Sequence, residues 1–83
     1  MSYEKVKQAT QVIVGTKQTL KHLDSGKISE VFIAKDADQR VTAKVIQLCE
    51  KSRIRVNFVD SMRKLGKAAG IEVGAAVVAL LND

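Results

Sequence analysis

The apolar run at residues 31–34 (VFIA) is the feature that most restricts how this chain can fold. Four consecutive apolar residues leave no polar face, which is typical of a strand that is covered on both sides. A second apolar run, at 75–81, is rich in small residues and favours another central strand. Val56 and Phe58 alternate with polar residues in a third strand-like segment. We therefore expect a sheet with helices on its two faces.

The segments between these runs have the length and the spacing of helices. Strands are predicted at 11–14, 28–34, 55–59 and 75–81, and helices at 3–10, 16–24, 40–51 and 62–69. The third helix has apolar residues at i, i+4, i+7 and i+8, a core stripe formed by Val41, Val45, Leu48 and Cys49. Strands separated by helices need crossover connections, so the sequence predicts one α/β domain over residues 1–83, built as an α/β/α sandwich.

Polar residues and glycines mark where the predicted helices begin and end. Ser2 is a candidate N-cap of the first helix, and Asp60-Ser61 is a candidate cap of the fourth. Gly26 is expected at the C-cap of the second helix. Gly66 interrupts the fourth helix, which indicates that another segment packs closely against it.

Composition narrows the class of function. Fourteen Lys and Arg residues against nine Asp and Glu give a net charge of +5, which favours a polyanionic partner, most often nucleic acid. Tyr3, Phe32 and Phe58 are the only aromatic residues, so we do not expect base stacking to carry the affinity. No apolar run reaches about 18 residues and the first residues are polar, which predicts a cytoplasmic protein without a membrane span. The single cysteine, Cys49, is expected to be a packed thiol.

Residues 15–21 (GTKQTLK) combine a turn with the start of a helix. Gly15 permits unusual backbone angles after the first strand. Helical spacing places Lys17, Gln18 and Lys21 on one polar face, close to the N–H groups that a helix leaves unpaired at its start. Two cations and an amide at this position could bind phosphates and base edges. A solvated helix face is the alternative interpretation of the same pattern.

Two other segments carry residues that could form a site, one acidic and one apolar. Asp36 and Asp38 follow the second strand, where α/β proteins carry their sites, and could bind Mg²⁺ or accept a phosphoryl group. Phosphoryl chemistry needs further groups that other strands would have to place, so we expect one of the two to cap the third helix. We predict no catalytic residue, no metal site and no cofactor. In the loop at 71–73, Ile71 and Val73 could cover an unstacked base or a protein partner, and one of them is expected to turn inward.

Three segments, in this order, resemble motifs of the kink-turn-binding ribosomal protein family of the L7Ae/L30e type. Residues 15–21 resemble its G-x-N/K-E/Q-x-x-K motif, and residues 31–38 (VFIAKDAD) resemble its apolar strand and A-x-D-x-D turn. Residues 65–76 (LGKAAGIEVGAA) resemble its LG-x-A-x-G loop. The similarity spans nearly the whole chain and is greatest to the bacterial YbxF-like branch. It implies a three-layer α-β-α sandwich around a four-stranded mixed sheet.

The resemblance also implies a function. Members of this family bind the RNA kink-turn, a bent helix–bulge–helix with tandem sheared G·A pairs, and the protein is expected to stabilise that bent form. The implied RNA-binding residues are Gly15, Thr16, Lys17, Gln18, Lys21, Lys35, Arg63, Lys64, Lys67, Ile71, Glu72 and Val73. By this resemblance Lys17, Gln18 and Lys21 would reach guanine edges and nearby phosphates. The basic residues from Lys35 to Lys67 in this set would lie near the backbone, and the loop at 71–73 would cover flipped-out bulge nucleotides.

The chain differs from other members of the family at residues 17 and 18 and at residue 39. Lys17-Gln18 stands where archaeal relatives have Asn-Glu, which replaces an acceptor carboxylate by a cation and leaves base selectivity open. Gln39 replaces the proline that usually follows the second aspartate, a change expected to affect only the turn.

The expected partner is therefore structured RNA that contains a kink-turn, bound by a monomer that is associated with the ribosome or with other structured RNA. Two alternatives remain open. One is a protein-interaction module that uses the loop at 71–73 within the ribosome. The other is a phosphoacceptor or metal site at Asp36 and Asp38.

Overall fold

The computed structural model describes residues 3–82 of the chain. Within these residues four helices alternate with four strands: α1 (Tyr3–Gln8), β1 (Val12–Val14), α2 (Thr16–His22), β2 (Ile28–Ala34), α3 (Gln39–Lys51), β3 (Arg55–Val59), α4 (Met62–Ala68) and β4 (Val77–Leu81). The predicted order of elements is confirmed, and β2 and β3 have the predicted bounds. The predicted cap Ser2 lies outside the described residues.

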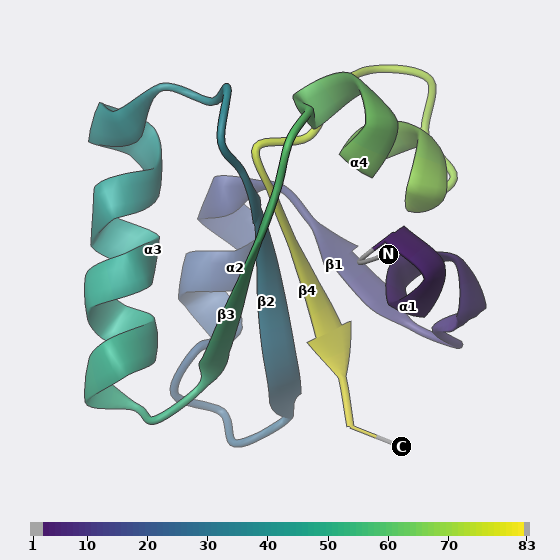
Figure 1. Ribbon diagram of the computed structural model, residues 1–83. Helices are drawn as coiled ribbons and strands as arrows, with labels where there is room; N and C mark the ends of the chain where they lie inside the picture. The colour runs from purple at the N-terminus through teal and green to yellow at the C-terminus, as the bar shows by residue number, and fades with distance from the viewer. Residues whose placement is uncertain (1–2, 83) are drawn as a thin grey trace.

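The strands form one mixed sheet in the order β1-β4-β2-β3. The β4 strand is antiparallel to β1 and β2, whereas β2 and β3 are parallel to each other. The carboxyl ends of β1, β2 and β3 therefore lie at the same edge as the amino end of β4 (Figure 1). We call this edge the carboxyl edge, and it carries the β1–α2, β2–α3, β3–α4 and α4–β4 connections.

Helices cover both faces of the sheet, with α1 and α4 on one face and α2 and α3 on the other (Figure 1). Phe32 and Ala34 of β2 are buried in the α1/α4 layer, while Val31 and Ile33 are buried in the α2/α3 layer. Successive side chains of a strand point to opposite faces, so a strand between two apolar layers needs a continuous apolar run. The predicted three-layer α-β-α sandwich and the central position of β4 are confirmed.

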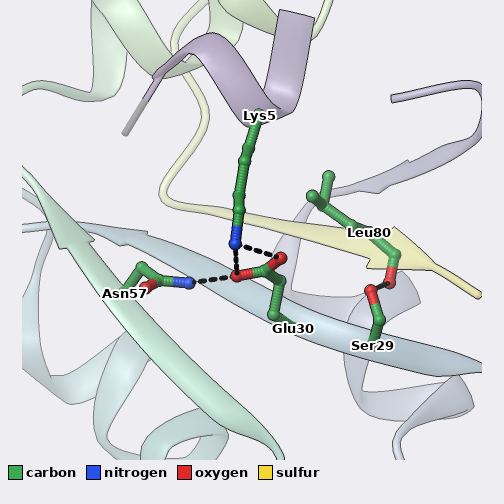
Figure 2. A network of polar contacts seen from close by, with 5 residues as sticks. All are labelled: Lys5, Ser29, Glu30, Asn57 and Leu80. Atoms are coloured by element: carbon green, nitrogen blue, oxygen red, sulfur yellow. Dashed lines mark hydrogen bonds and ion pairs between the residues drawn. The ribbon is translucent and has the colours of Figure 1, made fainter. Parts of the chain in front are cut away.

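One half-buried carboxylate fixes α1 to the sheet (Figure 2). The Lys5 ammonium of α1 lies 3.1 and 3.3 Å from the two carboxylate oxygens of Glu30 in β2. The side-chain amide of Asn57 in β3 donates to the same carboxylate at 2.8 Å. The Glu30 side chain is largely shielded from solvent, so these contacts satisfy a charge that would otherwise be costly to bury.

The core stripe of α3 differs from the prediction at one position. Val41 is 41% exposed, whereas Thr42 is only 5% exposed and takes the place expected for Val41. The helix begins at Gln39, and the buried residues Thr42, Val45 and Cys49 follow at i, i+3 and i+7. The predicted burial of Val45 and Cys49 is confirmed, and burial raises the pKa of the Cys49 thiol, as expected for a packed cysteine.

The end of α2 also differs from the prediction. The helix ends at His22 with Leu23 as its C-cap, so the predicted C-cap at Gly26 is wrong. The Ser25 hydroxyl donates to the His22 carbonyl at 2.7 Å and accepts from the Lys27 N–H at 3.1 Å, which turns the chain before Gly26 is reached. Gly26 instead adopts φ 79° in the turn that leads to β2. None of the helices between residues 3 and 82 is long and apolar enough to cross a membrane.

Candidate nucleic-acid interface

The start of α2 is fixed to the middle of the sheet through Gly15. This residue adopts φ 104°, a backbone conformation that side chains with a Cβ rarely adopt. Its N–H donates to the Val77 carbonyl at 2.9 Å, and its carbonyl accepts from the Thr19 N–H at 3.1 Å. Within the described chain no side chain caps this helix start, so its first N–H groups remain available to a ligand.

The polar face of α2 is exposed as predicted. Lys17, Gln18 and Lys21 are exposed, while Thr19 and Leu23 on the opposite side are buried against the sheet. Between residues 3 and 82 neither lysine makes an ion pair with an acidic side chain. The two cations and the amide therefore face solvent with their binding capacity unused.

The two aspartates after β2 both serve as helix caps. Asp38 accepts from the Arg40 N–H at 2.9 Å at the start of α3, and the Arg40 guanidinium holds the pKa of Asp38 below its ordinary 3.8. Asp36 accepts from the Met62 N–H at 2.8 Å and so caps α4 from the neighbouring turn. The prediction that one of the two caps α3 is confirmed. Among the described residues no three His, Cys, Asp or Glu side chains are grouped for a metal ion.

The β3–α4 turn separates the roles of Asp60 and Ser61. The Ser61 hydroxyl accepts from the Lys64 N–H at 3.2 Å and is the N-cap of α4, as predicted. Asp60 does not cap the helix. Its carboxylate accepts from the Tyr3 hydroxyl, which lowers the pKa of Asp60, and lies 3.6 Å from the Lys64 ammonium. The charge of Lys64, one of the predicted RNA-binding cations, is thus partly neutralised by Asp60.

The α4–β4 loop lies directly against α4, as Gly66 had indicated. A Cβ added at Gly66 would lie 2.0 Å from the carbonyl oxygen of Val73. The Ile71 N–H donates to the Gly66 carbonyl at 3.0 Å, which holds the beginning of the loop. Ile71 packs against the α1/α4 core, whereas Val73 is 70% exposed. The prediction that one of the two aliphatic residues turns inward is confirmed.

The carboxyl edge brings most of the predicted residues to one end of the molecule (Figure 1). The α2 start, the β2–α3 turn, the first turn of α4 and the α4–β4 loop meet there, and they carry Gly15, Thr16, Lys17, Gln18, Lys35, Arg63, Lys64, Glu72 and Val73. Lys21 lies one turn further along α2. Lys67 lies in the last turn of α4, and it lines a hollow between α1 and α4 together with Tyr3, Lys7 and Lys64.

A sequence profile of the ribosomal protein L7Ae/L30e/S12e/Gadd45 family matches residues 2–83. The chain belongs to this family. An RNA-binding protein of Halalkalibacterium halodurans is 59% identical over 80 residues, which cover 96% of this chain and 98% of that protein. The RNA-binding protein YbxF of Geobacillus stearothermophilus is 51% identical over 82 residues, which cover 99% of this chain and all of that protein. The predicted resemblance to the YbxF-like branch is confirmed.

The similarity extends to a solved structure of a eukaryotic protein. The Giardia lamblia 15.5kD RNA binding protein matches with a TM-score of 0.89 at 27% identity, over 99% of this chain and 72% of that chain. All three proteins are named RNA-binding proteins, and RNA binding is the non-catalytic class of function predicted for this chain.

Two features of this L7Ae-family protein could not be read from its sequence motifs. The bond from Met62 to Asp36 joins residues 26 positions apart, so local spacing gave no signal of it. Phe58 is 48% exposed because β3 is an edge strand, and its alternation with polar residues does not indicate which strand lies at the edge. A prediction of strand order would have been needed to find this exposed ring.

Proposed function

We propose that the protein binds RNA at the carboxyl edge, recognises the kink-turn and stabilises its bent form. The observation that carries the proposal is the meeting of two different surfaces at this edge. One is the polar face of α2 with Lys17 and Gln18, and the other is the loop that exposes Val73. Membership of the L7Ae family, whose relatives reported above are named RNA-binding proteins, supports RNA as the class of ligand.

Each surface suits a different part of such an RNA. The Gln18 amide carries both a donor and an acceptor for base edges, and the ammonium groups of Lys17 and Lys21 suit phosphates. The helix start is held in place by the bond from Gly15 to Val77, so little order has to be gained on binding. The exposed Val73 side chain offers an apolar surface to a base that has left its stack.

The bend itself would be stabilised by selective binding. Without salt a kink-turn is mostly extended, because the bend brings phosphates together. A protein that binds only the bent form shifts the equilibrium by its difference in affinity for the two forms. A shift from about 1% to about 99% bent requires a preference of about 5.5 kcal/mol. Cations beside an apolar loop could supply this preference without a metal or a cofactor.

The test is energy transfer between two dyes at the ends of a kink-turn RNA in buffer without Mg²⁺. We expect the protein to raise the transfer, and we expect no rise when the sheared G·A pairs are replaced by Watson–Crick pairs. A variant with Lys17→Ala and Lys21→Ala should need far more protein for the same rise. Tight binding that leaves the RNA extended would reject the proposal, because the charge alone would then explain the affinity.

The proposal includes a monomeric protein that acts in the cytoplasm without a cofactor. It also includes association with the ribosome, since the family is one of ribosomal proteins. Sedimentation of the protein with ribosomes at physiological salt, compared with the Lys17→Ala and Lys21→Ala variant, tests this part separately.

A further inference from the structure

A cavity of about 440 Å³ opens beside the carboxyl edge, between the end of β2, the first turns of α3 and the β3 strand. Ile33, Ala37 and Ile46 give it an apolar floor, while Lys35, Gln39 and Phe58 contribute to its wall. The residues that line the cavity come from β2, the β2–α3 turn, α3 and β3, whereas α2, which packs against β1, β4 and α3, and the loop at 71–73 contribute none. It is therefore separate from the α2 surface and from the loop at 71–73.

The Phe58 ring is the unusual part of this cavity. Phe58 pairs with Ile33 in the parallel register of β2 and β3, and the other side of β3 has no neighbouring strand among the described residues. The side chain is 48% exposed although the chain has only two phenylalanines, and the other, Phe32, is buried in the core. An aromatic face is thus presented at the mouth of an apolar hollow.

We propose that this cavity binds one unpaired nucleobase, stacked on the Phe58 ring, of an RNA that is bound at the carboxyl edge. Its volume falls in the range typical of small-ligand sites, roughly 300–1,000 Å³. Unpaired bases stack readily on aromatic side chains in RNA-binding proteins. The Gln39 amide can donate to and accept from a base edge, and the Lys35 ammonium can reach a phosphate.

Charge and continuity favour a nucleotide over a protein side chain as the occupant. None of the described residues that line the cavity is acidic, and Lys35 is the charged group among them. Lys35 also belongs to the carboxyl edge, where its N–H donates to the Val59 carbonyl at 2.7 Å. Asp36 and Asp38 of the same turn do not line the cavity, and each is already engaged, Asp36 with the Met62 N–H and Asp38 with the Arg40 guanidinium. The inference rests on the proposed function in one respect only, namely that the base belongs to an RNA bound at the carboxyl edge.

The direct test is an NMR titration of the full chain with tetra-adenylate and with tetra-uridylate. These single strands contain no kink-turn, so a response of the Phe58 ring to them does not depend on the proposed function. The ring signals of Phe58 are expected to move upfield as a base stacks on the ring, while those of buried Phe32 stay in place and serve as the internal reference. The larger adenine surface should give the larger shift.

Matched variants separate stacking from simple apolar contact. Phe58→Ala is expected to weaken oligonucleotide binding roughly tenfold, and Phe58→Tyr, which keeps the aromatic face, is expected to restore it. Val41→Ala is the control, because Val41 is another exposed apolar residue and does not line the cavity. If Phe58→Ala alters the fold, Lys35→Ala and Gln39→Ala test the same site, and each should weaken binding several-fold.

Two results would overturn the inference. One is a Phe58 ring signal that does not move with either oligonucleotide while Phe58→Ala binds as the wild type does. The other comes from light-induced crosslinking in cells that express the chain with Phe58→p-benzoylphenylalanine: crosslinks to RNA support a base in the cavity, whereas crosslinks to protein alone reject it. Failure of the kink-turn test with a moving Phe58 signal would reject the proposed function and leave this site standing.

Discussion

Gly66 and Val73 are packed so closely that a Cβ on Gly66 would lie 2.0 Å from the carbonyl oxygen of Val73. Val73 can therefore lie where it does only because Gly66 in α4 has no side chain. The same contact explains a glycine inside a helix, where it costs about 1 kcal/mol relative to alanine.

Gly66→Ala is expected to destabilise the fold by roughly 1–3 kcal/mol, although helix propensity alone would favour alanine. The backbone of the loop must move to make room for the methyl group, so RNA affinity should fall as well. Denaturant unfolding and RNA titration measure the two effects, with Lys67→Ala on the exposed side of the same helix as the control for stability. An alanine variant as stable as the wild type would mean that the loop adapts without cost.

Lys17→Ala, Gln18→Ala and Lys21→Ala are each expected to weaken kink-turn binding by roughly 1–3 kcal/mol, the range for a good base contact. Folding stability should change little, because all three side chains are exposed. Lys51→Ala is the matched control, since Lys51 is an exposed lysine in the last turn of α3, away from the carboxyl edge. Wild-type affinity in all three variants would place the interface elsewhere.

Val73→Asp is expected to reduce RNA affinity more than Lys64→Ala does. A carboxylate on the exposed loop would be desolvated against a base and repelled by phosphates. Lys64 already lies 3.6 Å from Asp60, so its removal takes away a cation that is partly neutralised. Fluorescence anisotropy with labelled RNA ranks the two variants, and circular dichroism checks the fold. Equal affinities for Val73→Asp and the wild type would exclude the loop from the interface.

Tyr3→Phe is expected to lower the melting temperature at neutral pH and to matter less in acid. The Tyr3 hydroxyl donates to Asp60 and is the largest cause of the lowered pKa of that carboxyl. A carboxyl whose pKa is lower in the folded state stabilises the fold above its ordinary pKa of 3.8, and this contribution is lost as the pH falls through the lowered value.

Thermal unfolding of both proteins between pH 6 and pH 2 measures this effect. The gap between the two melting temperatures should narrow over the acid part of that range. A gap that stays constant down to pH 2 would show that the hydroxyl acts through packing and not through the Asp60 charge.

The order of elements and the three layers were predictable because the hydrophobic periodicity within each segment indicates whether it is a helix or a strand and which of its faces are buried. The run 31–34 could only be a strand buried on both faces, and the bounds of β2 and β3 follow from the turn residues around them. Val41 and Thr42 could not be separated in the same way, because a shift of one residue in the helix start rotates the core stripe by about 100°.

Contacts between segments that lie far apart in the sequence could not be predicted from local sequence patterns. Asp36 was recognised as a capping residue, but the helix that it caps lies 26 residues further along the chain. The exposure of Phe58 depends on β3 being an edge strand, which is a property of strand order and not of the strand. For the predicted RNA-binding residues the sequence supplied the motif, and the structure adds the location of most of them at the carboxyl edge, with Lys67 further along α4 in its last turn.

The bond from the Gly15 N–H to the Val77 carbonyl has a mechanical consequence. Val77 begins β4, which is buried and has a strand on either side, so a force applied at the start of α2 passes directly into the interior of the sheet. A flexible partner that contacts Lys17 or Gln18 therefore binds to side chains whose backbone is held by the sheet. During association the partner then changes its conformation, while the backbone of the protein keeps its own. The binding energy is thereby available to bend a more flexible molecule.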